Sequence, residues 1–187
     1  MTLNDTCIYT RRLILRKIEK EDLAQYLAWS NSKEAHGDYL TPESLGEAEA
    51  LEQFDSGTLW NHTSRTYLIL LRDGPSIGTI HFWLRPEKRS SAVMALKIAV
   101  PKYRNMGYGT EAQKFLIIHI FQRFAGRAIE LYTDVDNRAQ QRCLAKLGFR
   151  IVDCQTYDDQ HVKRTGYLFR LDDDGFRKHP IYRYHYE

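Results

Sequence analysis

Two glycines separated by a single residue lie between a strand pattern and a helix pattern, and this junction constrains the fold more than any other part of the chain. They are Gly107 and Gly109, within the sequence Arg-Asn-Met-Gly-Tyr-Gly-Thr at residues 104–110. The pattern predicts a strand before them at residues 92–100 and a helix after them at residues 108–124. Glycine lets the backbone take positive φ and approach a ligand closely, and the first N–H groups of the helix point into the same space. The junction therefore predicts a binding site for a phosphate or a pyrophosphate.

The order of the other predicted elements decides the fold class. A strand at residues 10–18 and a helix at residues 20–30 come first, and Thr-Pro-Glu-Ser at residues 41–44 predicts the start of a second helix. Short turns then separate three strands, which predicts an antiparallel meander at residues 66–71, 77–84 and 92–100. After the helix at the glycines come a strand, a helix and two strands, at residues 128–134, 137–146, 149–157 and 166–171. This order predicts an α+β (mixed α/β) fold and argues against a barrel or a sandwich.

Composition limits the class of protein further. The 187 residues, of which 43% are hydrophobic, predict one folded domain over residues 1–187. A formal net charge of +3, spread along the chain, argues against a nucleic-acid partner. The three cysteines, Cys7, Cys143 and Cys154, are odd in number and lack metal-ligand spacing, so we expect neither a disulfide framework nor a metal site. The longest apolar runs are shorter than the roughly 18 residues of a membrane span, so we expect a cytoplasmic protein.

Three segments together resemble the GNAT N-acetyltransferase superfamily. Residues 99–112 are similar to its motif R/Q-x-x-G-x-G/A, which binds the pyrophosphate of acyl-CoA. Residues 10–16 resemble the first strand of the RimJ/RimL-like branch, which acetylates protein N-termini and other amines, and residues 136–149 resemble the segment that ends in Lys-Leu-Gly-Phe. The resemblance covers residues 10–171 and implies the GNAT fold, with a mostly antiparallel twisted sheet. It also implies transfer of acetyl from acetyl-CoA to a primary amine by direct attack in a ternary complex.

The resemblance also assigns residues to acetyl-CoA, the implied cosubstrate. Main-chain groups at the end of the central strand would pair with the pantetheine arm as an added strand does, and these belong to Ile98, Ala99 and Val100. The pyrophosphate would be held by Arg104 and by the amides of Asn105, Met106, Gly107, Tyr108, Gly109 and Thr110. Asn137 would hydrogen-bond the pantetheine or the acyl end, although an N-cap of the following helix is an alternative role.

The sequence departs from the family at the positions that transfer protons. Many members have a glutamate on the central strand as general base and a tyrosine that protonates the leaving thiolate. The matching residues here are Met94 and Leu144, and neither can exchange a proton. Lys97 stands where an apolar or aromatic residue is usual, and we expect it to be a surface lysine that extends its ammonium into water.

The pKa of the acceptor amine decides how much these vacancies matter. A lysine-type amine costs about 4.6 kcal/mol to deprotonate at pH 7, whereas an α-amino group costs only about 1 to 1.4 kcal/mol. The vacancies therefore favour an α-amine or another amine of low pKa. By residue type, His81 on the strand before the central one is the candidate replacement base, although a structural histidine is the alternative.

The acceptor and the assembly state stay open at this point. In the family the acceptor is recognised largely by the first two helices and their loop, here residues 36–39 and 59–62, and it is either a small-molecule amine or a protein N-terminus. A homodimer is compatible with the sequence, and no membrane partner is expected.

Two other classes of function compete with the acetyltransferase. The vacant proton-transfer positions suggest a non-catalytic acyl-CoA-binding module. The spacing Gly107-x-Gly109-x-x-Ala112 also fits a dinucleotide fingerprint, which suggests an NAD-dependent oxidoreductase. Against the second alternative, six residues separate Val100 from Gly107 and the motif follows a meander instead of opening a βαβ unit.

Overall fold

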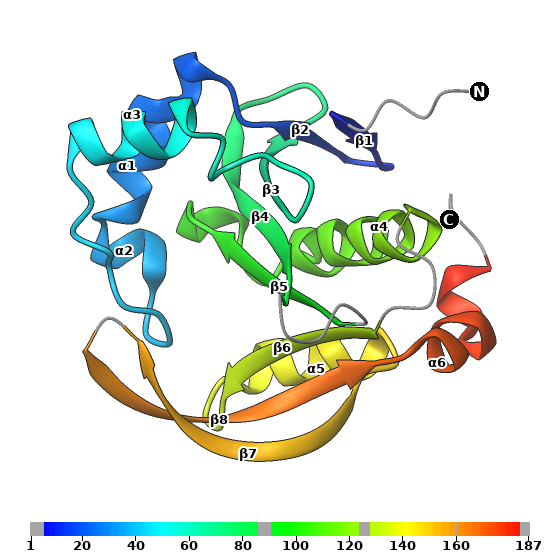
Figure 1. The fold of residues 1–187 in the computed structure, drawn as a ribbon. Helices are drawn as coiled ribbons and strands as arrows, with labels where there is room; N and C mark the ends of the chain where they lie inside the picture. Colours follow the sequence, from blue (N-terminus) through cyan, green and yellow to red (C-terminus); the bar gives the residue numbers. More distant parts are fainter. Residues whose placement is uncertain (1–5, 86–90, 124–127, 160, 184–187) are drawn as a thin grey trace.

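The computed structural model describes residues 6–85, 91–123, 128–159 and 161–183, which form one eight-stranded sheet with helices on both faces (Figure 1). The strand order across the sheet is β1-β2-β3-β4-β5-β6-β8-β7. The strands are β1 (Cys7–Tyr9), β2 (Leu13–Lys17), β3 (Ser64–Leu71), β4 (Ser76–Leu84), β5 (Ser91–Ile98), β6 (Ala128–Asp134), β7 (Arg150–Asp159) and β8 (Val162–Leu171).

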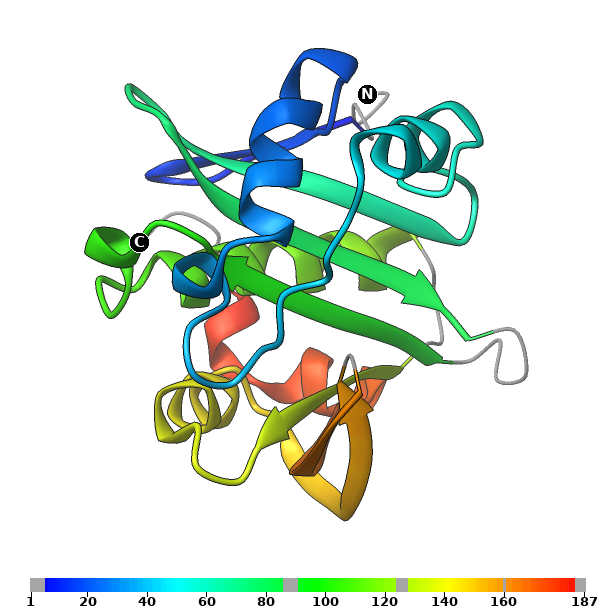
Figure 2. The same ribbon diagram turned by 90° about the vertical axis from the view of Figure 1, so that its left-hand side faces the viewer.

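Helices from the two halves of the chain cover opposite faces of this sheet. In Figure 2, α1, α2 and α3 lie in front of the strands and α4 and α6 lie behind them. The α-helices are α1 (Leu23–Ser30), α2 (Lys33–His36), α3 (Glu47–Asp55), α4 (Tyr108–Arg123), α5 (Arg138–Lys146) and α6 (Asp173–Lys178). Short 3-10 helices are η1 (Lys20–Asp22), η2 (Pro101–Tyr103) and η3 (Pro180–Tyr182).

Strand alternation sends β4 and β5 side chains into two different environments. On the α4 face, Ile80, Phe82 and Met94 belong to the main hydrophobic core, which also contains Leu116 of α4 and Leu144 of α5. On the opposite face a smaller cluster is formed by Trp29, Ala35, Leu68 and Ala99. Polar residues of β4, one position away from the core residues, therefore point toward the layer of α1 to α3.

The sheet parts between its fifth and sixth strands. β5 and β6 are parallel neighbours, but only three residue pairs join them, and the last is Val93 with Glu130. The other six neighbouring pairs are antiparallel. The doubly wound parallel sheet that a dinucleotide-binding oxidoreductase requires is therefore not the architecture of the described chain, and that alternative is wrong.

The structure confirms the predicted α+β class, the meander and the order of the later elements, but it contradicts the helix predicted to start at residues 41–44. The helix begins instead at Glu47. Asn31 holds Leu45 by two hydrogen bonds, accepting from its N–H at 2.6 Å and donating to its carbonyl at 2.8 Å. Leu45 is buried and Ser44 has a φ of 56°, so tertiary contacts override the local capping signal. The turn predicted at residues 85–90 lies almost entirely outside the described residues.

At Gly78 the backbones of β4 and β5 approach closely. A Cβ at this position would lie 2.0 Å from the backbone oxygen of Lys97. Because that neighbour is backbone within a sheet, Gly78→Ala should lower the free energy of unfolding by about 2–4 kcal/mol in urea denaturation. Gly46→Ala is the control, since nothing lies within 4 Å of its added Cβ, and should change stability by less than about 1 kcal/mol. Equal effects of the two substitutions would contradict the close approach.

Candidate active site

The glycine-containing loop between β5 and α4 presents a free helix N-terminus. Asn105 and Gly107 have φ values of 59° and 81°, so the chain turns through the left-handed region twice before α4 begins. The N–H of Glu111 donates to the Gly107 carbonyl at 3.0 Å and so makes the first intrahelical bond. The N–H groups of the preceding turn have no intrahelical acceptor, and the 16-residue helix places partial positive charge there. The geometry suits an anion.

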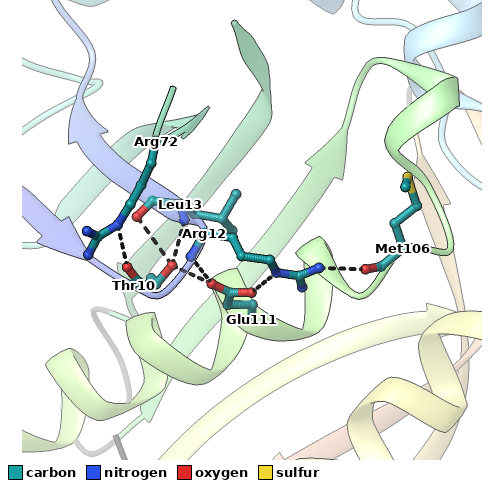
Figure 3. Close-up of polar contacts among 6 residues, drawn as sticks. All are labelled: Thr10, Arg12, Leu13, Arg72, Met106 and Glu111. Atoms are coloured by element: carbon teal, nitrogen blue, oxygen red, sulfur yellow. Dashed lines mark hydrogen bonds and ion pairs between the residues drawn. The ribbon is translucent and has the colours of Figure 1, made fainter. Parts of the chain in front are cut away.

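A clamp from the start of β2 fixes this loop (Figure 3). Arg12 Nε donates to Glu111 Oε2 at 2.6 Å, and Arg12 Nη1 donates to the Met106 carbonyl at 3.0 Å. Thr10 Oγ1 and the Arg12 N–H both donate to Glu111 Oε1, at 2.6 and 2.8 Å. Because the Met106 carbonyl points toward Arg12, the trans peptide directs the N–H of Gly107 away from it. The clamp thus orients the loop amides.

The charges of the clamp shift the titration of its carboxylate. Burial alone would raise the pKa of Glu111, but hydrogen bonds from Thr10 and Arg12 and the Arg12 charge outweigh it, so the pKa is lowered. Sequence reading assigned no role to Arg12 or Glu111. They are 99 residues apart, and no local pattern links them.

Arg104 is held by the protein itself. Its guanidinium donates to the backbone carbonyls of Ile98 at 2.9 Å, Glu34 at 2.6 Å and Ala35 at 3.0 Å. These contacts tie α2 to the end of β5. A contact between this side chain and a bound anion stays a prediction.

A cavity of about 410 Å³, here called the inter-strand cavity, lies where β5 and β6 part. It is lined on one side by Met94 and Leu96 and on the other by Leu131 and Thr133. Thr133 is 4% exposed, and its hydroxyl has no hydrogen-bond partner among the described residues. The hydroxyl oxygen itself is almost inaccessible, so Thr133 borders the cavity without offering it a free hydroxyl.

The backbone of β5 offers groups to this cavity, but not all of those predicted. The N–H groups of Ala99 and Val100 both donate to the Ile77 carbonyl, at 2.9 and 3.2 Å. By strand alternation, the backbone groups of Met94, Leu96 and Ile98 face the opposite, open side, where pairing with β6 has ended. The Ile98 carbonyl is taken by Arg104. The open edge therefore lies nearer the middle of β5 than the sequence predicted.

Asn137 performs its alternative role. Its Oδ1 accepts from the N–H of Gln140 at 3.1 Å and caps α5. Asn137 also lines the inter-strand cavity, so its amide group borders the space in which its predicted ligand contact would form.

A second cavity of about 480 Å³ lies on the other face of the sheet and is here called the helical-face cavity. It is bounded by α1, α2 and α3 on one side and by β3, β4 and β5 on the other. Of the two predicted acceptor segments, His36 and Leu59 line this cavity and Tyr39 lines the inter-strand cavity. The two cavities meet, because they share the wall residues Leu40, Trp83, Ala95, Leu96 and Asp159.

His81 lies in the wall of the helical-face cavity, level with this junction. It pairs across the sheet with Ala95, and its ring stacks on Trp83 with centroids 5.0 Å apart. Burial, together with the nearby Lys97 charge, lowers the pKa of His81 to about 4. The imidazole is therefore neutral at pH 7 and able to accept a proton.

Lys97 contradicts its predicted surface position. Its side chain is 15% exposed and lines the helical-face cavity. Nζ lies 2.8 Å from His36 Nε2 and 3.9 Å from Glu43 Oε1. Burial lowers the pKa of Lys97, an effect that the charges of Glu43 and Asp159 oppose. The layer of α1 to α3 covers this face of β5, and the local sequence around Lys97 does not predict that these helices pack there.

Met94 and Leu144 hold no proton-transfer group in the structure either. Met94 is 2% exposed, and Leu144 is fully buried in the same core. Both pack as core residues.

Comparison with known proteins identifies the family to which the chain belongs. The sequence profile of the acetyltransferase (GNAT) domain matches residues 12–150. The chain belongs to the GNAT acetyltransferase family. A search of curated proteins finds no sequence that matches the chain.

Solved structures share the fold at low sequence identity. Spermidine N-acetyltransferase from Vibrio cholerae, in complex with CoA and spermine, has a TM-score of 0.77 and 15% identity, covering 89% of this chain and 99% of its own. RimL, a ribosomal-protein alpha-N-acetyltransferase in complex with coenzyme A, has a TM-score of 0.75 and 16% identity over 90% and 99%. A GNAT acetyltransferase from Bacillus anthracis has a TM-score of 0.73 and 17% identity over 90% and 99%.

Two features, a membrane-spanning helix and a group of metal ligands, are absent from the described residues. No helix there is long and apolar enough to cross a membrane. No group of three or more His, Cys, Asp or Glu side chains in the same residues could hold a metal ion.

The Glu111 clamp should stabilise the fold in a pH-dependent way. Glu111→Gln removes charge-assisted hydrogen bonds and should cost about 1–3 kcal/mol of unfolding free energy at pH 7. Because the pKa of Glu111 is lowered in the folded state, this contribution is present above its ordinary pKa of about 4.3 and is lost as pH falls through the folded value.

Urea denaturation at pH 7 and pH 3 measures the effect. The gap between wild type and Glu111→Gln should narrow at pH 3. The exposed Glu52→Gln on α3 is the control and should stay within about 0.5 kcal/mol at both pH values. A gap that does not change with pH would contradict the charged clamp.

Proposed function

We propose that the chain is an N-acetyltransferase that uses acetyl-CoA to acetylate a primary amine by direct attack in a ternary complex. The observation that carries this proposal is the meeting of two cavities at one wall. One lies in the parted sheet, and the other lies beneath α1 to α3. Two substrates entering from opposite faces could therefore react without a covalent enzyme intermediate.

The chain's residues fit the parts of acetyl-CoA. The amides of the loop and first turn of α4, residues 105–110, would hold the pyrophosphate, with the Arg12 clamp keeping them in place. The open edge of β5 at Leu96 and Ile98 would pair with the pantetheine arm as an added strand. Thr133 and Asn137, which line the inter-strand cavity, would border the same arm from the side of β6 and α5.

Acetyl-CoA supplies the activated acyl group, and the chain's residues handle the amine. The helical-face cavity would orient the acceptor toward the wall at Ala95. An acceptor nitrogen that has bonded to the acyl carbon carries an acidic proton, and the neutral imidazole of His81, level with that wall, would accept it. The low pKa of His81 makes it a weak base, which favours an acceptor amine of low pKa such as an α-amine.

Two fold neighbours support an amine acceptor. The names of RimL and of the Vibrio cholerae enzyme describe acetylation of a protein alpha-amine and of spermidine. For this chain the acceptor is accordingly a protein N-terminus or a small-molecule amine.

A second candidate function is a non-catalytic acyl-CoA-binding module. The burial of Met94 and Leu144 in the core favours it, since both family proton-transfer positions are apolar. The two functions differ in turnover. Release of free thiol from acetyl-CoA in the presence of an amine supports the enzyme, and tight acetyl-CoA binding without thiol release supports the module.

Gly107→Ala should weaken acetyl-CoA binding. Gly107 has a φ of 81°, and an added Cβ would lie 3.3 Å from Arg12 Nη2, so the loop amides should shift. We expect the Kd for acetyl-CoA, measured by isothermal titration calorimetry, to rise about 10-fold or more. Gly57→Ala is a matched control, because Gly57 has a φ of 75° but precedes the loop before β3. Equal Kd values for the two variants would count against an anion site at this loop.

His81→Gln should lower kcat. Loss of a positioned proton acceptor typically costs 10²- to 10⁴-fold, so we expect a fall of about 10²-fold or more with little change in the acetyl-CoA Kd. Because the pKa of His81 is about 4, the wild-type pH profile should show no ionisation near 6.5 and should rise with deprotonation of the amine. The exposed His161→Gln, which lies outside both predicted acceptor segments, is the control. Equal kcat for the two variants would leave His81 with a structural role only.

A further inference from the structure

The charges around the helical-face cavity are balanced in pairs. Its charged lining residues are Glu43, Lys97 and Asp159. Glu43 lies 3.9 Å from Lys97, and Asp159 accepts from Arg164 Nε at 2.8 Å. Each lining carboxylate thus has a cation nearby, so that Glu43, Lys97, Asp159 and Arg164 together carry no net charge.

The histidines of the cavity add no positive charge at neutral pH. His36 Nδ1 lies 2.9 Å from the Ser32 carbonyl, which accepts a hydrogen bond, so Nδ1 carries the proton. His36 Nε2 then accepts from Lys97. Burial lowers the pKa of His36 and of His81. Lys97 is therefore the positive group in the lining of this cavity.

The Lys97 ammonium has donor capacity left for a ligand. An ammonium group has three N–H donors, and one of them is directed to His36. The Glu43 oxygen at 3.9 Å is too distant for a hydrogen bond. A ligand oxygen entering the cavity would complete the coordination of this ammonium.

The strand geometry places Lys97 one step beyond the reacting position. Ala95 lies on the wall shared by both cavities and pairs with His81, whereas Lys97 pairs with Thr79. Ala95 and Lys97 point to the same face of β5 and are about 7 Å apart along the strand. An acceptor nitrogen at the level of His81 would therefore lie in the same cavity as the ammonium of Lys97, one pair of residues away along the strand.

We infer that Lys97 determines acceptor specificity by selecting amines that carry a carboxylate or carbonyl oxygen on the carbon next to the amine, and by disfavouring polyamines. This inference rests on the proposed acetyltransferase function. A second ammonium on the acceptor would meet the like charge of Lys97, and the negative charges of Glu43 and Asp159 are offset by Lys97 and Arg164. The chain thus shares its fold with a spermidine acetyltransferase but lines its cavity for a different acceptor.

Four acceptors that share the skeleton CH3–CH(NH2)–X test this inference. They are alanine, alaninamide, 1,2-diaminopropane and isopropylamine, in which X carries a carboxylate, a neutral carbonyl, an ammonium or no polar group. Initial rates of thiol release give kcat/KM for each acceptor with the wild type, Lys97→Met and Lys97→Glu. The exposed Lys178→Met on α6 is the control. Ratios between variant and wild type cancel the intrinsic reactivity of each amine.

We expect Lys97→Met to lower kcat/KM for the preferred oxygen-bearing acceptor about 10-fold relative to isopropylamine, mainly through KM. A change in the basicity of His81 would act on all four acceptors and cancels in this ratio. Lys97→Glu should raise kcat/KM for 1,2-diaminopropane above that for alanine. A preference for alanine indicates a free amino acid as acceptor, and a preference for alaninamide indicates a peptide N-terminus. A wild type that prefers the diamine, or ratios that are the same for all four compounds, would overturn the inference.

Failure of the proposed function gives a different result. If none of the four compounds is acetylated, calorimetric binding of the same series to the CoA-loaded protein decides the role of Lys97. If the oxygen-bearing compounds bind more tightly and Lys97→Met loses this preference, the selectivity assigned to Lys97 is supported and the acetyltransferase proposal fails. Equal binding of all four compounds would contradict both the acetyltransferase proposal and the selectivity assigned to Lys97.

Discussion

The parting of β5 from β6 is the constraint on which the rest of the structure depends. Parallel pairing stops at Val93 and Glu130, and Glu130 is 3% exposed with ion pairs to Arg85 and Arg170. A buried carboxylate is strongly destabilising without its partners, so this cluster fixes the point at which the strands separate. Beyond it, the edge of β5 is open and the inter-strand cavity forms, and Gly109 in the first turn of α4 lies against Leu96 and Ile98 of β5. The open edge of β5 and the inter-strand cavity therefore both result from the early end of β5–β6 pairing.

Local signals in the sequence predicted what depends on local structure. The meander followed from turn residues, and the loop at Gly107 followed from two glycines before a helix pattern, because both depend on neighbours in the chain. The helix start predicted at residues 41–44 was wrong because Asn31, 14 residues upstream, holds Leu45 in a non-helical segment. Lys97 was misplaced for a related reason. Its strand alternates as expected, but only the packed layer of α1 to α3 makes its face an interior one.

The arginines near the proposed anion site act mainly on the protein itself. Arg12 is neutralised by Glu111, and Arg104 binds backbone carbonyls. Attraction for a phosphate would therefore come chiefly from backbone amides and the α4 dipole, which are fixed before a ligand arrives. This explains why the motif at residues 104–110 could be recognised from sequence while its support could not. The glycines are local, whereas Thr10 and Arg12, which orient the amides, come from the segment just before β2.

The apolar Met94 and Leu144 leave the protein without the acid and base usual in the family, and the helical-face cavity compensates electrostatically. Burial lowers the pKa of His81 to about 4, and the positive charge of Lys97 adds to this effect. The same charge lies in the lining of the cavity in which an acceptor would bind. In the proposed enzyme, selectivity and proton acceptance would therefore be coupled through one side chain. Without that charge, His81 would become a stronger base but would also be protonated at a higher pH, and an acceptor oxygen would lose its donor. In the proposed mechanism, a single lysine held by His36 would thus connect the choice of amine to the loss of its proton.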